Sequence, residues 1–205
     1  MILECCLFLL VVSNFLLLAT PRIPTMTKCT AMQGILLSVL LLLFGHTILT
    51  GAVFLIKGIL LPGLLWHTQK SLPKESLVCP RKLAALNVVL GMAGLAFAIW
   101  LDGRLFITQE LFPPLFLPLG ITTLFCGFIL IVARIKAITH VIGYLVAENG
   151  IFLLGMPLMT QSTTWFELAL LLDVFVAVFV MGIAIDRISD SFASIDVARF
   201  RSLRD

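Results

Sequence analysis

The chain has 205 residues, of which 60% are hydrophobic and only 12% are charged, and its mean hydropathy is +1.14. A soluble domain is about a quarter charged, so this composition excludes a soluble protein and indicates an integral membrane protein. The net charge of +3 is modest, and the basic residues stand in short connectors without interleaved aromatics, which argues against nucleic acid as a partner.

Five stretches have the length of about 20 apolar residues that a membrane helix needs. They run Ile2 to Thr20, Leu83 to Leu101, Leu115 to Ala133, Val141 to Met159 and Phe166 to Ile185. The first begins "MILECCLFLL", with an acid at Glu4 and no positive region before it, so we expect a retained helix rather than a cleaved signal peptide.

A further apolar stretch, Ala31 to Trp66, is too long for one span. At 1.5 Å per residue it would extend about 54 Å, against a hydrocarbon core of about 30 Å. The polar group Gly45 to Thr47 suits a reversal, so the stretch is predicted to form two helices, Thr27 to Phe44 and Ile48 to Trp66. The predicted fold is therefore an all-α bundle of about seven transmembrane helices.

The distribution of lysine and arginine supports seven spans, because these residues gather in cytoplasmic loops. Seven spans leave Lys57 inside a helix and only Arg104 on the outer side. A six-span arrangement would move Arg22 and Lys28 outside and weaken the asymmetry. We therefore expect the N terminus outside and the C terminus in the cytoplasm. The twelve basic residues predicted on the cytoplasmic side are Arg22, Lys28, Lys70, Lys74, Arg81, Lys82, Arg134, Lys136, Arg187, Arg199, Arg201 and Arg204.

Three charged residues lie well inside predicted spans: Lys57, Glu148 and Asp173. A charge near the middle of a bilayer costs roughly 2.5 to 3.5 kcal/mol on insertion scales, so such residues are by default candidates for function. Two acids and a base that alternate as proton holders would form a proton relay.

Glu148 continues a polar stripe along its helix. His140, Tyr144 and Glu148 recur every four residues and so share one helix face, from the cytoplasmic edge to mid-membrane. Asn149 lies about 100° around the helix and could donate to a carbonyl on a neighbouring helix. The alternative is that Glu148 and Asn149 only bond helices together.

Lys57 and Asp173 each have two readings. Lys57 precedes Pro62, which often marks a break in a membrane helix, and it would reach the cytoplasmic surface only if the helix ended there. Otherwise it is a buried functional lysine. Asp173 serves either ion transfer or structural pairing, depending on whether Lys57, Glu148 or another subunit faces it.

No motif of an autonomous catalytic centre is present, and the five cysteines show no C-x-x-C spacing. We expect no catalytic residue, metal site or cofactor in this chain. The polar tail after Ile185 has apolar residues spaced for a short amphipathic helix at the membrane surface or against a partner.

Several segments together resemble the hydrogenase-4 component E family, the membrane subunits of group 4 nickel–iron hydrogenase and formate hydrogenlyase complexes. The segments are "NFLLLATPRI", "KGILLP", "RIKAITHVIGYLVAENGIFLLG", "FELALLLDVFVAVFVMGI" and "SIDVARF". The last three helices are similar to the small K subunit of respiratory complex I and to the C subunit of multisubunit sodium/proton antiporters. On that resemblance Arg134 and Lys136 match a basic connector, Glu148 the first carboxylate and Asp173, in place of the usual glutamate, the second.

The resemblance implies a four-helix region at 1–114, a three-helix region at 115–186 and a cytoplasmic tail at 187–205. It also implies a non-redox subunit in the cytoplasmic membrane of a bacterium or archaeon, beside antiporter-like subunits and coupled to a peripheral nickel–iron or other redox arm. The ion moved would be the proton or sodium. A structural linker between antiporter-like subunits, a subunit of a cation/proton antiporter and a stand-alone transporter remain alternatives.

Overall fold

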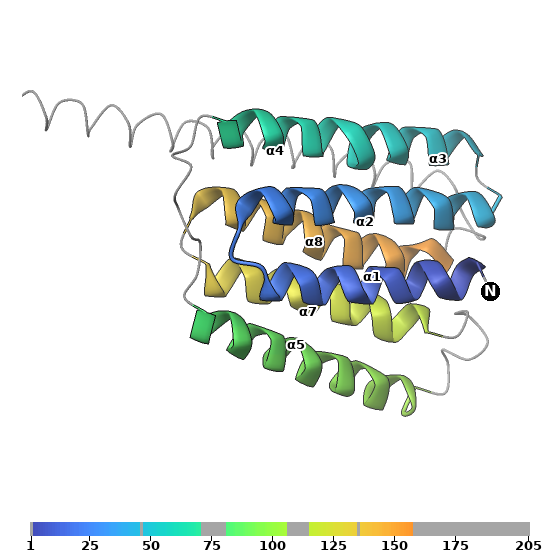
Figure 1. The fold of residues 1–205 in the computed structure, drawn as a ribbon. Helices are drawn as coiled ribbons and strands as arrows, with labels where there is room; N and C mark the ends of the chain where they lie inside the picture. The colour runs from blue at the N-terminus through green and yellow to red at the C-terminus, as the bar shows by residue number, and fades with distance from the viewer. Residues whose placement is uncertain (1, 46, 71–80, 106–114, 135, 158–205) are drawn as a thin grey trace, which may run out of the picture.

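The computed structural model describes residues 2–45, 47–70, 81–105, 115–134 and 136–157, and this part of the chain is helical throughout its regular structure (Figure 1). The helices are α1 (Ile2–Ala19), α2 (Ile23–Leu43), α3 (Thr47–Val53), α4 (Leu61–Lys70), α5 (Arg81–Asp102), α7 (Phe116–Ala133) and α8 (Ala137–Gly155), with a π-helix, η1 (Phe54–Leu60), between α3 and α4.

Six helical segments of the described residues are long and apolar enough to cross a membrane. They coincide with six of the seven predicted spans, and the reversal predicted at Gly45 is confirmed by its left-handed φ of +86°. The second helix begins earlier than predicted, at Ile23, because Pro24 occupies its first turn, where no N–H partner is needed. The predicted seventh span, Phe166 to Ile185, and the tail lie outside the described residues.

The third span is continuous through Pro62, so the proline does not end it. The π-turn ahead of the proline rearranges the hydrogen bonds: the Leu61 N–H bonds to the Ile56 carbonyl, five residues back. α3, η1 and α4 together form this one span, from Thr47 to Lys70.

The helices lie side by side and alternate in direction, with the third span at one edge, α5 at the other and α1, α2, α7 and α8 between them (Figure 1). Apolar side chains on α5 and the third span, among them Phe97 and Leu55, are exposed, as expected for helices that face lipid. Arg22 and Lys136 stand at one end of the bundle, where α2 and α8 begin, and Arg104 stands at the other, after α5.

Two apolar clusters occupy the two ends of the bundle interior. The first, which we call the basic-end cluster, lies at the end where α2 and α8 begin, and the second, the far-end cluster, lies at the opposite end. The basic-end cluster is Leu17, Leu18, Ile23, Met26, Cys29, Leu61, Leu65, Cys126, Ile129, Leu130, Ile138, Val141, Ile142, Leu145 and Val146. The far-end cluster is Cys6, Leu7, Leu10, Leu36, Leu37, Leu40, Leu41, Leu49, Val53, Phe116, Leu119, Phe152, Leu153 and Met156.

Each helix that contributes to both clusters changes from one to the other near its middle. On α1 the change falls between Leu10 and Leu17, and on α8 between Val146 and Phe152. These gaps hold buried polar residues, Ser13 and Asn14 on α1 and Glu148 and Asn149 on α8. A polar layer therefore crosses the bundle between two apolar clusters.

Glycines bring α7 and α8 into backbone contact. A Cβ on Gly127 would meet the backbone of Ala147, and one on Gly150 would meet the backbone of Leu124. A Cβ on Gly120 would lie 2.6 Å from the Leu154 side chain, and one on Gly143 would lie 2.8 Å from the Ile131 side chain. Small residues at such a seam let membrane helices approach closely, so α8 is held firmly against α7.

Candidate functional site

The candidate site is the polar layer, which we define as Asn14, Gln33, Lys57, Thr123, Glu148 and Asn149. These six residues come from α1, α2, η1, α7 and α8, and none is more than 6% exposed. Because polar groups buried without partners are costly, their hydrogen bonds decide what the layer can do.

An ion pair forms the core of the layer. The Lys57 Nζ lies 2.6 Å from the Glu148 Oε1, and the two residues are 5% and 6% exposed. Lys57 also donates to the Asn149 Oδ1 at 3.3 Å, and its ammonium lies 4.7 Å from the centre of the Phe152 ring. Two residues predicted independently as intramembrane charges are thus direct partners.

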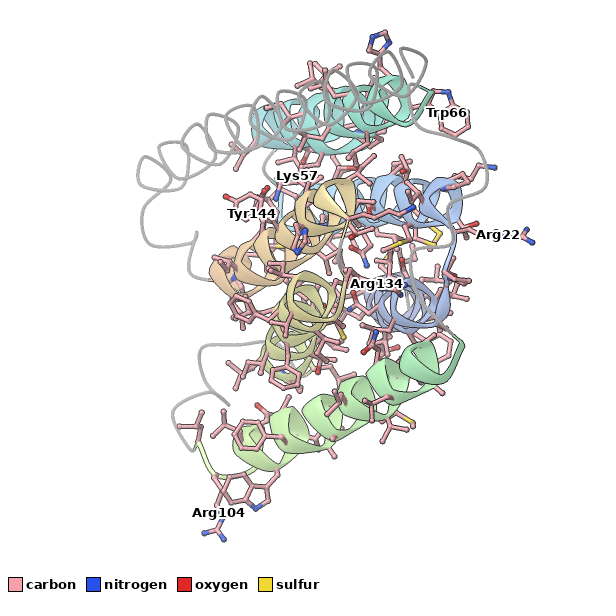
Figure 2. The ribbon with its side chains drawn as sticks, turned by 90° about the vertical axis from the view of Figure 1, so that its left-hand side faces the viewer. Arg22, Lys57, Trp66, Arg104, Arg134 and Tyr144 are labelled. Carbon is pink, nitrogen blue, oxygen red and sulfur yellow. The ribbon has the colours of Figure 1, made fainter. Side chains whose placement is uncertain are left out.

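The backbone around Lys57 explains why its side chain points inward. Lys57 lies at the centre of the π-helix, a rare form that is frequently found at functional sites. Its carbonyl packs where a side chain of Gly34 would stand, so only a glycine on α2 permits this approach. In the view along the helices, Lys57 lies between the third span and α8 (Figure 2).

This position excludes the alternative in which Lys57 extends to the membrane surface. That alternative required the helix to end at Pro62, but α4 continues to Lys70. A lysine that is 95% buried and bound to a carboxylate does not reach the surface.

A chain of amides extends from the ion pair across the bundle, and we call it the amide ladder. The Asn149 Nδ2 donates to the Gln33 Oε1 at 3.2 Å, and the Gln33 Nε2 donates to the Asn14 Oδ1 at 2.8 Å. The Asn14 Nδ2 donates to the Thr123 Oγ1 at 2.8 Å, and that hydroxyl donates to the Leu119 carbonyl at 2.7 Å. The ladder joins α8, α2, α1 and α7.

The prediction that Asn149 donates to a carbonyl on a neighbouring helix is confirmed, since the acceptor is the side-chain carbonyl of Gln33 on α2. Sequence reasoning missed Asn14 and Thr123 entirely. The available signal was that Asn14 and Gln33 are strongly polar residues in the interior of apolar spans.

His140 and Tyr144 lie on α8 between its start and Glu148. The His140 Nδ1 is 3.0 Å from the Lys136 carbonyl in the first turn of α8, and the imidazole is partly buried. Tyr144 is partly buried against the basic-end cluster, and in the view along the helices it falls beside Lys57 (Figure 2). Asp173, the remaining predicted site residue, lies outside the described residues.

Arg134 lies in the connector between α7 and α8, where it was predicted, and its side chain is buried. It is 2% exposed and its Nη2 donates to the carbonyls of Leu18 and Thr20, at 3.0 and 3.1 Å. These carbonyls end α1, where a helix has unpaired acceptors and partial negative charge. Figure 2 shows Arg134 inside the bundle, whereas Arg22 and Arg104 point away from it.

The described residues contain no group of three or more histidine, cysteine or acidic side chains placed to hold a metal ion. Cys5, Cys6, Cys29 and Cys126 are free thiols. The chemistry on which this site can draw is therefore that of the amine, the carboxylate and the amides of the polar layer.

Comparison with known proteins gives no match: no family model, no curated protein and no solved structure matches the chain. The case for its function rests on the geometry of the polar layer. What the findings establish is a multi-pass, all-helical membrane protein with six candidate spans in its described part.

Proposed function

We propose that this protein is a non-redox membrane-arm subunit of a complex I-like membrane-bound hydrogenase or formate hydrogenlyase and takes part in moving protons or sodium ions. The observation that carries the proposal is the buried ion pair of Lys57 and Glu148, whose charged atoms lie 2.6 Å apart. Buried ionisable pairs at membrane depth mark ion pathways and proton relays.

The pair has the geometry of a proton-exchange site. At 2.6 Å a proton passes from the Lys57 ammonium to the Glu148 carboxylate without movement of the heavy atoms, leaving a neutral amine and a carboxylic acid. The acid then releases a proton and the amine takes one up, which restores the pair. Neither step requires a cofactor in this chain.

The route to the pair follows α8. In this proposal protons enter at the basic end, which is the cytoplasmic side, and pass His140 and Tyr144 to reach the Lys57–Glu148 pair. Beyond the pair, transfer continues to Asp173 or to acids of an adjoining antiporter-like subunit. The peripheral arm of the complex, nickel–iron hydrogenase or another redox module, supplies the driving reaction.

The decisive test is Glu148→Gln in the intact complex, reconstituted in vesicles with hydrogen turnover and proton movement both recorded. The substitution keeps the side-chain shape and an oxygen for Lys57 but removes the group that accepts the proton. Glu4→Gln is the matched control, because Glu4 is an exposed acid at the start of α1, about 15 Å along the helix from Asn14 of the polar layer. We expect proton movement per turnover to fall at least tenfold in Glu148→Gln only. Undiminished pumping with normal turnover would refute the proposal.

A second candidate function is a structural linker that holds antiporter-like subunits together. The amide ladder favours it, because the ladder bonds four helices and leaves its amides paired. A linker predicts that Glu148→Gln releases subunits from the complex on native gels. The ion-moving role predicts a fully assembled complex that is uncoupled.

A further inference from the structure

The orientation of the amide ladder is dictated by Lys57. A lysine ammonium has three donors and no acceptor, so Asn149 must present its oxygen to Lys57 and its NH₂ to Gln33. Gln33 must then present its oxygen to Asn149 and its NH₂ to Asn14. Asn14 in turn faces Thr123 with its NH₂. One charge therefore sets the direction of three amides.

The ladder does not itself conduct protons. A carboxamide neither gains nor loses a proton near neutral pH, and three carboxamides follow one another between Lys57 and Thr123. The ladder instead couples the orientations of its amides, so that the orientation of Asn149 fixes those of Gln33 and Asn14. Chains of hydrogen bonds polarise one another in a low-dielectric interior, and this ladder is 0 to 3% exposed along its length.

We propose that Gln33 is a positioning residue for the Lys57–Glu148 pair, and that through it the ladder reports the charge of Lys57 to Asn14 on α1 and Thr123 on α7. While Lys57 is charged, Gln33 holds the Asn149 oxygen against the ammonium. When Lys57 gives its proton to Glu148, its nitrogen gains a lone pair and can accept a hydrogen bond. Asn149 then no longer has to face Lys57 with its oxygen. The three amides can then reverse as a set.

In the reversed ladder each amide donates toward Lys57 and accepts from the far side. The Thr123 hydroxyl turns from the Leu119 carbonyl to the Asn14 oxygen. Nothing else in the ladder loses a partner, so the two orientations differ mainly in their fit to Lys57. Proton transfer between Lys57 and Glu148 thereby changes the hydrogen bonds of Asn14 on α1 and Thr123 on α7, although neither helix carries a charged group of the layer. This inference extends the proposed function, since that function supplies the change in charge.

The chain offers a direct spectroscopic test, because it contains only three asparagines: Asn14, Asn87 and Asn149. Two belong to the ladder, and Asn87 is a buried residue of α5 outside it. The full chain is produced with ¹⁵N-labelled asparagine and purified in detergent micelles. The three side-chain NH₂ resonances are then recorded by NMR in the native chain and in Lys57→Met. We expect the Asn149 and Asn14 resonances both to move by more than that of Asn87.

Gln33→Met should interrupt the ladder between Asn149 and Asn14, because methionine has a similar length to glutamine but lacks its amide donor and acceptor. In that background Lys57→Met moves the Asn149 resonance and leaves that of Asn14 in place. Ser13→Ala is the matched control, because Ser13 neighbours Asn14 and bonds the Cys29 carbonyl of α2 without joining the ladder. In the Ser13→Ala background, Lys57→Met still moves the Asn14 resonance.

An Asn14 resonance that ignores Lys57→Met, or one that still responds after Gln33→Met, overturns the proposal. If Lys57→Met alone does not fold, Lys57→Met/Glu148→Gln removes both charges of the polar layer and serves for the same comparison. The measurement needs no transport. A positive result with a failed proton-pumping test leaves the ladder standing and rejects the proposed function, and the opposite pair of results does the reverse.

Discussion

Lys57→Met is expected to destabilise the protein more than any other single substitution in the polar layer. It leaves the carboxylate of Glu148 buried, at 6% exposure, without the cation 2.6 Å away. Breaking a buried pair by removing one partner costs about 3 to 5 kcal/mol. That cost lowers the folding equilibrium constant roughly a hundredfold to several thousandfold.

Glu148→Gln should cost less. Lys57 keeps its bond to the Asn149 oxygen at 3.3 Å and its position over the Phe152 ring at 4.7 Å, and the new amide offers an oxygen in place of the carboxylate. The main loss is the charged character of one hydrogen bond, about 1.5 to 3 kcal/mol. The ammonium therefore tolerates the loss of its partner better than the carboxylate does.

The double variant Lys57→Met/Glu148→Gln contains no charge in the polar layer, so its cost in unfolding free energy should be far below the sum of the two single costs. Replacing a whole buried ion pair by neutral residues is often close to neutral. The costs of the two single variants sum to about 4.5 to 8 kcal/mol. For the double variant we expect a cost of only about 1 to 2 kcal/mol. The coupling energy is then about 2.5 kcal/mol or more, at or above the upper end of measured pairs.

The assay is equilibrium unfolding of the purified chain by SDS in mixed micelles, followed by circular dichroism. All four members of the cycle are measured at the same pH and salt concentration. Single costs that simply add in the double variant would refute the reasoning, because additivity means that Lys57 and Glu148 do not depend on one another in the folded protein.

Three further predictions concern helix packing, capping and topology. Gly150→Ala forces a Cβ into the backbone of α7 and should cost about 1 to 3 kcal/mol of stability, whereas Gly51→Ala, which meets nothing within 4 Å, should gain about 0.5 to 1 kcal/mol. Arg134→Met removes two charged hydrogen bonds to the end of α1 and should cost about 3 kcal/mol, whereas Arg104→Met at the surface should cost less than about 1 kcal/mol. In a chain without its five native cysteines, Arg104→Cys should react with an impermeant maleimide from outside intact cells, and Arg22→Cys only after lysis.

The same unfolding assay checks the first two, and each has a clear contrary result. Equal stability of Gly150→Ala and Gly51→Ala would mean that α7 and α8 are not in backbone contact. If Arg134→Met costs no more stability than Arg104→Met, Arg134 does not stabilise the end of α1. Labelling of Arg22→Cys in intact cells would reverse or reject the predicted topology.

Much of the fold follows from local properties of the sequence. A membrane span must bury about 20 apolar residues and pair its own backbone groups, so composition alone located six helices that the structure describes. The reversal at Gly45 followed from the excess length of the stretch that contains it. The cost of an intramembrane charge pointed to Lys57 and Glu148 before any partner was visible.

The partnerships within the layer were beyond sequence reasoning, because they depend on which helix faces meet. Sequence spacing put Glu148 in line with His140 and Tyr144 on its own helix, and Asp173 seemed as eligible a partner as Lys57. The π-turn at Lys57 and the absence of a side chain at Gly34 decided the matter, since they bring η1 against α2 and turn the lysine inward.

The sequence by itself determined that this protein lies in a membrane, roughly where its described spans lie along the chain, and which buried charges required an explanation. Only the tertiary structure decided that Lys57 binds Glu148 and that Asn149, Gln33 and Asn14 continue from it as one ladder. The physical reason is that burial in a bilayer is a property of each segment. A hydrogen bond between helices exists only when their packing sets donor and acceptor at the same depth and on facing sides.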